Sequence, residues 1–236
     1  MTPRLFIETP LSVGREVELP DSGSHHLSRV LRLRESDALT LFDGTGGEWE
    51  AEFLGKGRAR LRTFREVERE SPLAVTLVQG VSSGERMDYT IQKAVELGVA
   101  AIQPILTKKG VVKLEGKRAD SRVEHWRRVV IAACEQCGRN RIPEVRPLVD
   151  LAYYLRDAAG TGARLLLSGQ GRSIREMGVQ TEATLAAGPE AGFAAEEQAA
   201  LERIGFVKAS LGPRVLRTET AALAALAALN VLRGDF

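Results

Sequence analysis

The pattern of predicted secondary structure changes once along the chain, near Ser71-Pro72, and this change constrains the fold of the 236 residues more than any other feature. Before it, short apolar runs alternate with glycine-containing turns, which is typical of closely spaced strands. After it, strands alternate with helices, which indicates a mostly parallel sheet covered on both faces. We therefore predict an α/β protein with two domains, residues 1–70 and 71–236.

The first domain is predicted to be a small β-barrel. Its strands are expected at residues 38–43, 48–54 and 58–65, with the turns DGTGG and GKG between them. Short strands at this spacing are typical of small barrels. One helix is expected over residues 25–33. Its apolar side would consist of Leu27, Val30, Leu31 and Leu33.

The second domain is predicted to alternate strands and helices up to its end. Strands are expected at 73–78, 102–106, 164–168, 184–187 and 206–208, and helices at 85–97, 122–137, 194–204 and from Thr218 onward. The last helix is apolar on nearly every side over residues 221–232, so it must be covered all round. Either the same domain or a second subunit provides that cover, and we predict a homodimer.

Composition limits the compartment and the metal chemistry. No apolar run approaches the roughly 18 residues of a membrane span, so we expect a cytoplasmic protein without membrane contact. Cys134 and Cys137 have the spacing of a metal or redox pair. However, the chain has only three histidines and no second cysteine pair to complete a zinc site. We predict that both thiols are packing residues and that there is no metal site.

Positive charge is concentrated in two stretches, although the net charge is only +2. Residues 108–146 hold 11 Lys and Arg against 5 Asp and Glu. The strand expected at 58–65 places Arg58, Arg60 and Arg62 on one face, because side chains alternate along a strand. Each stretch fits either a phosphate-binding surface or a solvated one. Together they favour a nucleic-acid surface.

Two glycine-bearing turns follow predicted strands late in the chain, GPEAGF at 188–193 and SLGPR at 210–214. Ligands of open α/β sheets bind beyond the carboxyl ends of strands, so both turns are candidates to face one pocket. Each turn alone also fits a helix cap or a chain reversal. The turn GVSSG at 80–84 matches neither a P-loop nor a Rossmann fingerprint, which disfavours those nucleotide folds.

The second turn leads into the last helix through two arginines. Thr218 is the expected N-cap, and the carboxylate of Glu219 suits the positive end of the helix dipole. By the same argument, Arg214 and Arg217 are electrostatically misplaced at a helix N-terminus unless an anion compensates. We therefore regard these two arginines as functional candidates.

Five segments, in order along nearly the whole chain, resemble the SPOUT-class family of 16S ribosomal RNA uracil-N3 methyltransferases called ribosomal RNA small subunit methyltransferase E. They are HHLSRVLRLRESD (25–37), KAVELGVAAIQP (93–104), EQCGRNRIP (135–143), GPEAGF (188–193) and LGPRVLRTETA (211–221). One departure is Ala191, where the family usually has glycine. The resemblance implies a PUA-like barrel, a SPOUT α/β-knot with a deep C-terminal trefoil knot, and a homodimer. It also implies S-adenosyl-L-methionine (SAM) as methyl donor and 16S ribosomal RNA, or the small ribosomal subunit, as partner.

The resemblance further implies which residues form the site. The residues expected to hold SAM are Leu167, Ser168, Gly188, Pro189, Glu190, Gly192, Ser210, Leu211, Gly212, Arg214 and Leu216. Uracil N3 must lose its proton to become nucleophilic, so a proton acceptor or a cation that stabilises the anion is required. The catalytic candidates are Arg217, Glu219, Glu135 and Arg139, with Glu190 and Arg214 as further choices. Arg217 ranks first, because a cation acts without a shifted carboxylate pKa.

N3 lies on the Watson–Crick edge, so the target base must be unpaired or flipped out before the reaction. The first domain would hold the surrounding RNA through His25, His26, Arg29, Arg32 and Arg34, although the two histidines also fit a solvated loop. Two alternatives remain open at this point. One is a SPOUT enzyme for tRNA or another ribosomal RNA base, and the other is a non-catalytic RNA-binding factor of ribosome assembly.

Overall fold

The computed structural model describes residues 2–158 and 162–236, and within these the side chains of Ser22, His26 and Val30 lie outside the description. The described chain forms two compact units. The first comprises Met1–Glu70 and Cys134–Ile142, and the second comprises Ser71–Ala133 and Pro143–Phe236. The segment from Cys134 to Ile142 thus belongs to the first unit, whereas the sequence pattern assigned it to the second domain.

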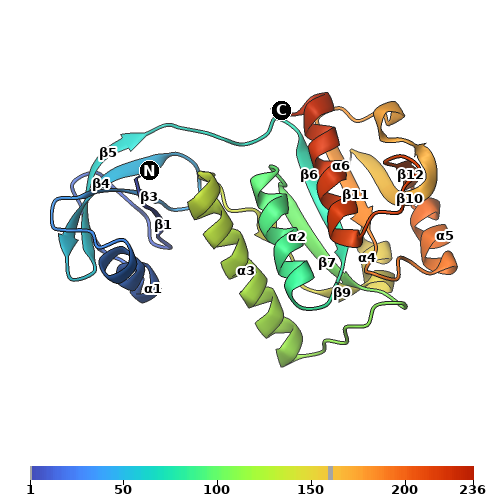
Figure 1. Ribbon diagram of the computed structural model, residues 1–236, viewed down its shortest axis with the longest axis horizontal. Coiled ribbons are helices and arrows are strands. Elements are labelled where there is room, and N and C mark those ends of the chain that lie inside the picture. The colour runs from blue at the N-terminus through green and yellow to red at the C-terminus, as the bar shows by residue number, and fades with distance from the viewer. Residues whose placement is uncertain (1, 159–161) are drawn as a thin grey trace. The chain divides into compact units, whose positions relative to one another are not determined.

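The first unit is built on one five-stranded sheet in the order β1-β3-β4-β5-β2 (Figure 1). Its strands are β1 (Arg4–Phe6), β2 (Glu16–Glu18), β3 (Ala38–Phe42), β4 (Glu48–Gly55) and β5 (Arg58–Arg65). Alternation along β5 buries Ala59 and Leu61 and leaves Arg58 and Arg62 exposed. The buried side chains of all five strands form one hydrophobic core.

The basic face of β5 forms as its alternation predicts, but its arginines are paired. Arg60 lies opposite Glu16 in the antiparallel register, and its guanidinium nitrogen is 2.6 Å from the carboxylate. The other arginines of β5 are paired as well, Arg58 with Glu16, Arg62 with Glu52 and Arg65 with Glu50. In these cross-strand pairs, acidic side chains compensate the positive charge that the sequence pattern predicted to be open to phosphate.

The helix predicted over residues 25–33 is wrong in its bounds. The structure has α1 (Asp21–His25) followed by the π-helical turn η1 (His26–Val30). Arg32 has a left-handed backbone, with φ of 54°, and the Leu33 amide donates to the Leu27 carbonyl at 2.9 Å, so the chain reverses there. Of the apolar side, Leu27 is fully buried whereas Leu31 is 45% exposed.

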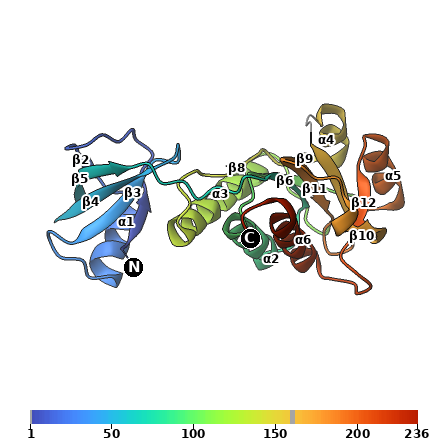
Figure 2. The same ribbon diagram turned by 90° about the horizontal axis from the view of Figure 1, so that it is seen from above.

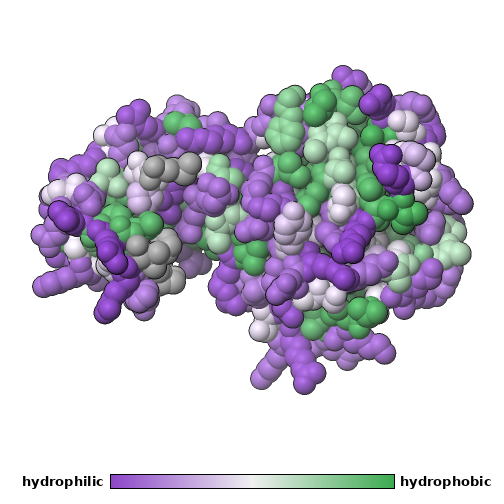
Figure 3. All heavy atoms as spheres, in the orientation of Figure 1, coloured by the Kyte–Doolittle hydropathy of each residue, from purple (hydrophilic) through white to green (hydrophobic). Residues whose placement is uncertain are grey.

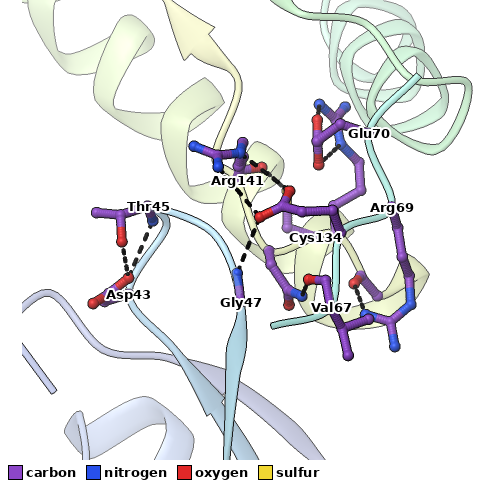
Figure 4. A network of polar contacts seen from close by, with 12 residues as sticks. Asp43, Thr45, Gly47, Val67, Arg69, Glu70, Cys134 and Arg141 are labelled. Carbon is purple, nitrogen blue, oxygen red and sulfur yellow. Dashed lines mark hydrogen bonds and ion pairs between the residues drawn. The ribbon is translucent and has the colours of Figure 1, made fainter. Parts of the chain in front are cut away.

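The segment after α3 (Lys117–Cys137) is held in the first unit by a polar network (Figure 4). The side chain of Asn140 donates to the Val67 carbonyl at 2.6 Å and accepts from Arg4 at 2.6 Å. The Arg141 guanidinium contacts Glu68 at 3.1 Å. These hydrogen-bond partners are far apart in sequence, so the sequence pattern did not predict that this segment belongs to the first unit.

The second unit is built on a parallel sheet of seven described strands. Its main order is β12-β10-β11-β6-β7-β8, and β9 also pairs with β7. The strands are β6 (Ala74–Gly80), β7 (Ala101–Leu106), β8 (Glu144–Val145), β9 (Val149–Asp150), β10 (Ala163–Ser173), β11 (Glu182–Ala187) and β12 (Val207–Ser210). Every pairing in this sheet is parallel.

Helices cover both faces of this sheet, which explains why β6 and β7 are almost continuously buried (Figures 1 and 2). The helices α2 (Glu85–Glu96) and α6 (Thr218–Arg233) pack together on one face. The other face carries α4 (Leu151–Asp157) and α5 (Ala195–Arg203), whose side chains join the core around Phe193. A short 3-10 turn, η2 (Ile174–Glu176), follows β10.

Buried Cys134 lacks the surroundings of a reactive thiol. Burial raises the pKa of the Cys134 thiol to about 12, against the opposing field of Arg139. Within residues 2–158 and 162–236, no group of three or more His, Cys, Asp or Glu side chains is arranged to hold a metal ion. In the same ranges no helix combines the length and the apolar character needed to cross a membrane.

Candidate functional site

The irregular part of β10, where its register with β12 shifts, and the loops after β11 and β12 line one cleft. Its larger cavity, of about 580 Å³, is lined by Arg86, Leu167, Ala187, Gly188, Pro189, Glu190, Ala191, Gly192, Val215, Leu216, Arg217, Thr218, Glu219 and Ala221. A smaller cavity of about 160 Å³ is lined by Leu167, Ser168, Gly169, Ala209, Leu211, Gly212, Arg214, Val215, Leu216 and Ala221. Four residues line both cavities, so the two adjoin.

The register of β10 explains how three strands reach one cleft. Next to β12, the pairing of β10 shifts between Leu167 and Arg172, so the chain leaves regular strand geometry there. Leu167 then faces both cavities, between the turn after β11 and the loop after β12. Neighbouring parallel strands therefore bring together segments that are far apart in sequence.

Almost all of the residues predicted to hold SAM line this cleft. The exception is Ser210, whose hydroxyl accepts from the Gly212 amide at 3.2 Å and so stabilises the turn from outside the lining. Among the catalytic candidates, Arg217 and Glu219 line the larger cavity. Glu135 and Arg139 line neither cavity, and both belong to the first unit.

A buried hydrogen-bond junction fixes the turn after β11 against the start of α6. The Gln79 side-chain amide, at the end of β6, donates to the Gly188 carbonyl at 3.4 Å and to the Thr218 hydroxyl at 3.2 Å. The Thr218 hydroxyl donates in turn to the Gly188 carbonyl. The expected N-cap role of Thr218 is therefore wrong. Arg217 occupies the N-cap position, and the Thr218 hydroxyl bonds across the cleft instead.

Glu190 is held in place by the turn after β6. Its carboxylate accepts from the amide and the hydroxyl of Ser83, both at 2.9 Å, and pairs with Arg86 at 3.1 Å. Partial burial acts to raise the pKa of Glu190, but these hydrogen bonds outweigh it and hold the pKa below its ordinary value. Glu190 is thus suited to positioning the loop and poorly suited to accepting a proton.

Glycines in the turn after β11 and in the strand β6 beside it are required by close packing or by backbone conformation. A Cβ on Gly80 would lie 2.5 Å from Pro189, and one on Gly188 would lie 2.9 Å from the Gly192 Cα. Gly192 has a left-handed φ of 66°. Ala191 is not among the described residues with positive φ, and its side chain is exposed. The departure from the family's glycine therefore imposes no backbone strain.

The charged residues of the cleft are mostly without partners. Arg214 and Arg217 are exposed and Glu219 is half-buried. None of the three side chains forms an ion pair within the described residues. Glu135 and Arg139 differ, because the Glu135 carboxylate accepts from the Phe6 amide at 3.0 Å and buried Arg139 is paired with Glu70. This arrangement is typical of a structural ion pair.

The predicted RNA-binding residues of the first unit are solvent-accessible where they are described. His25, Arg29, Arg32 and Arg34 are exposed, whereas the side chain of His26 lies outside the described residues. Sequence reasoning missed three residues that shape the cleft, Gln79, Ser83 and Arg86. The polar segment QGVSSGER at the end of a buried strand was the available signal.

Two family models match the chain. An RNA methyltransferase domain matches residues 69–230, and an RNA methyltransferase PUA domain matches residues 19–64. Ribosomal RNA small subunit methyltransferase E of Buchnera aphidicola subsp. Acyrthosiphon pisum is 31% identical, over 99% of this chain and 95% of the relative. The enzyme of the same name from Mycobacterium tuberculosis is 34% identical, over 96% and 90%.

Solved structures agree with this result. A methyltransferase from Legionella pneumophila in complex with the cofactor SAM has a TM-score of 0.95 and 39% identity, with both chains fully covered. Ribosomal RNA small subunit methyltransferase E from Neisseria gonorrhoeae, bound to SAM, has a TM-score of 0.92 and 40% identity, again over both whole chains. The predicted SPOUT α/β class with a PUA-like first domain is confirmed, and the knot stays a prediction. Over nearly its whole length, therefore, this chain is a member of the ribosomal RNA small subunit methyltransferase E family.

Proposed function

We propose that the cleft lined by β10 and by the loops after β11 and β12 is where a methyl group passes from SAM to N3 of a uridine in 16S ribosomal RNA. Family membership makes the protein a SAM-dependent methyltransferase of small-subunit ribosomal RNA. The proposal adds the acceptor atom and the residues. The observation that carries it is the convergence of the irregular part of β10 and the loops after β11 and β12 on one cleft, which holds nearly all of the residues expected to contact SAM.

The lining of the cleft suits SAM. Leu167, Leu211 and Leu216 offer apolar surface for a flat adenine ring. The tight turn from Gly188 to Gly192 presents backbone amides and carbonyls that can read the edge of the ring without charged side chains. When bound, SAM supplies an electrophilic methyl group. The protein itself must orient the acceptor base, exclude water and manage the N3 proton.

Arg217 is placed to stabilise the uracil anion. Arg217 lines the larger cavity and its guanidinium has no ion-pair partner among the described residues, so its charge is available to a carbonyl oxygen of the base. Glu219 lines the same cavity and is the better-placed proton acceptor, because Glu190 is already engaged by Ser83 and Arg86. We assign no catalytic role to Glu135 or Arg139.

The first unit would hold the RNA around the target nucleotide. The exposed cations Arg29, Arg32 and Arg34 follow one another near η1 and remain without ion pairs in the described part of the chain. Such a surface favours contacts with phosphates and RNA shape over base readout. This arrangement leaves recognition of the target base to the cleft. Because the substrate is ribosomal RNA, we place the enzyme in the cytoplasm.

A homodimer is part of the proposal. A hydrophobic strip covers α6 in the space-filling view (Figure 3). Val231 and Leu232 in its last turns are 65% and 40% exposed, and Phe236 is 59% exposed. A second copy of the chain would remove this surface from water. Sedimentation of the wild type and of a Val231→Asp, Leu232→Asp variant tests this, since only the wild type should sediment as a dimer.

Two measurements test the enzymatic proposal. Mass spectrometry of nucleosides from 16S RNA, with and without the protein, should show 3-methyluridine only with active protein. Isothermal titration should show that the wild type binds SAM. Leu216→Arg, whose larger side chain fills the cleft, should bind SAM at least about tenfold more weakly. The matched control is Val13→Arg at a 62% exposed site in the first unit. A different methylated nucleoside, or equal SAM affinity in both variants, would refute the acceptor atom or the site, respectively.

A further inference from the structure

The N-terminal half of α3 forms a basic groove in the second unit. A cavity of about 540 Å³ is lined by Leu114, Lys117, Arg118, Ser121, Arg122, His125 and Arg128. It shares no lining residue with the cleft. The groove thus combines four Lys or Arg side chains, a histidine and a hydroxyl, and none of its lining residues is acidic.

The helix period places these cations along one side of α3. Lys117, Ser121, His125 and Arg128 recur at spacings of four, four and three residues, with Arg118 and Arg122 beside them. At 1.5 Å per residue, the row from Lys117 to Arg128 extends over about 16 Å. Hydrophilic side chains gather over this end of α3 in Figure 3. The row is long enough to follow several consecutive phosphates.

The four cations of the groove are free of internal partners within the described ranges. Lys117, Arg118, Arg122 and Arg128 form no side-chain hydrogen bond or ion pair there. Of the acids nearby, Asp88 on α2 contacts His125 of the groove at 2.7 Å and Glu124 pairs with Arg127. Glu115 and Asp120 are exposed and form no ion pair with the groove within the described ranges. Like charges this close repel one another, so the cluster lacks the compensation that an external anion would supply.

We propose that this groove binds the phosphodiester backbone of the RNA substrate, at nucleotides other than the one that enters the cleft. The inference rests on the proposed function for the identity of the RNA. The charge pattern favours a polyanion with regularly spaced charges, because phosphate contacts position an RNA without reading its sequence. A single-stranded or helical segment of 16S RNA supplies that pattern.

The principal test removes three charges from the groove in Arg118→Gln, Arg122→Gln, Arg128→Gln. The matched control removes three paired charges from β5 in Arg58→Gln, Arg60→Gln, Arg62→Gln. Affinity for fluorescein-labelled 16S RNA fragments is measured by fluorescence anisotropy over a range of salt concentrations. The groove variant should bind at least about tenfold more weakly, and its slope of log affinity against log salt should fall by about two to three. The control should stay within about twofold of wild type.

Methylation kinetics separate this proposal from the proposed function. The groove variant should raise the KM for small ribosomal subunits, while kcat at saturation and SAM affinity stay within about twofold of wild type. Since RNA binding is measured directly, the groove is tested whichever nucleotide is methylated. Unchanged RNA affinity, or an equal loss in the β5 control, would overturn the proposal. So would a loss of binding to assembled subunits with unchanged binding to free 16S RNA, because that result assigns the groove to a ribosomal protein.

A measurement on the wild type removes any dependence on variant folding. Lys117 is exposed, so its amine reacts with an acylating reagent in the free protein. Saturating 16S RNA should slow its modification at least about fivefold, as measured by peptide mass spectrometry. Lys208 on β12, whose amine pairs with Glu202 of α5 at 2.8 Å, is the internal control and should react equally with and without RNA. Equal reactivity of Lys117 in both conditions would contradict the proposal even if every variant misfolded.

Discussion

The two units treat their charged side chains differently. In the first, Glu48 is shared by Arg4 and Arg69, Arg139 is paired with Glu70, and the arginines of β5 face acids on neighbouring strands. In the second, Arg214 and Arg217 of the cleft and the arginines of the α3 groove have no such partners within the described residues. The basic run of β5 is therefore structural, whereas the basic run of α3 is available to a ligand.

Ion pairing with an acidic side chain, and not the local density of charge, therefore separates structural cations from functional ones. A buried ion such as Arg139 is tolerated only when its charge is compensated, so removing either partner destabilises the fold. An exposed cation such as Arg217 is solvated and contributes little to folding. Its charge becomes useful when an anionic ligand binds beside it. Substitutions in the two classes should accordingly affect different measurements.

The largest effect is expected for an unpaired cation of the cleft. Arg217→Ala should lower kcat at saturating SAM and RNA by about 10² to 10³, because it removes the stabilising charge beside the uracil anion. The free energy of unfolding should stay within about 0.5 kcal/mol of wild type. Exposed Arg175, which lines neither cavity of the cleft, provides the control variant Arg175→Ala. A wild-type rate for Arg217→Ala would end its catalytic assignment.

A paired cation of the first unit should behave in the reverse way. Arg139→Met leaves the Glu70 carboxylate without its buried partner and should lower the free energy of unfolding by about 3 kcal/mol. At a temperature where the variant is folded, kcat should change less than about threefold. Urea denaturation and single-turnover methylation measure the two effects. A large loss of kcat in a fully folded variant would return Arg139 to the catalytic candidates.

Thr218 sharpens the comparison, because it is a partnered group at the edge of the cleft. Thr218→Val removes the donor to the Gly188 carbonyl and the acceptor for Gln79. It should lower the free energy of unfolding by about 1 to 2 kcal/mol. SAM affinity should fall about tenfold, since the turn after β11 loses its link to α6. The control is Thr220→Val at an exposed position two residues on. Equal SAM affinity in both variants would show that the junction does not shape the site.

Much of the cleft could be predicted from sequence because its geometry follows from topology. Strands that alternate with helices form a parallel sheet, and the carboxyl ends of neighbouring parallel strands meet at one edge. The two glycine-bearing turns at such ends both line the cleft, as the topology predicts, whereas Leu167 and the other individual SAM contacts were predicted from the family resemblance. Of the four catalytic candidates, only Arg217 and Glu219 line the cleft, because Glu135 and Arg139 were inferred from segment resemblance alone.

What could not be predicted depends on partners distant in sequence. Nothing local to Arg60 indicates Glu16, and nothing local to Gln79 indicates Thr218. The N-cap rule failed at Thr218 because a tertiary hydrogen bond competed for its hydroxyl. The left-handed backbone at Arg32 likewise ended a helix that periodicity alone would extend.

The smallest expected effect concerns acidic pH and compares a carboxylate from each unit. Burial opposes ionisation of Glu48, but hydrogen bonds from Arg69 and Arg4 hold its pKa below the ordinary value, and the pKa of Glu190 is lowered in a similar way. A lowered folded-state pKa gives stability that is present above the unfolded pKa and is lost as the pH falls. The free energy of unfolding should therefore decrease below about pH 5, less steeply in Glu48→Gln and in Glu190→Gln than in wild type.

Only Glu190→Gln should also weaken SAM binding at neutral pH, because its partners Ser83 and Arg86 fix a loop of the cleft. Weaker SAM binding in Glu48→Gln would show that the paired charges of the first unit influence the cleft, and the division between structural and functional charges would fail.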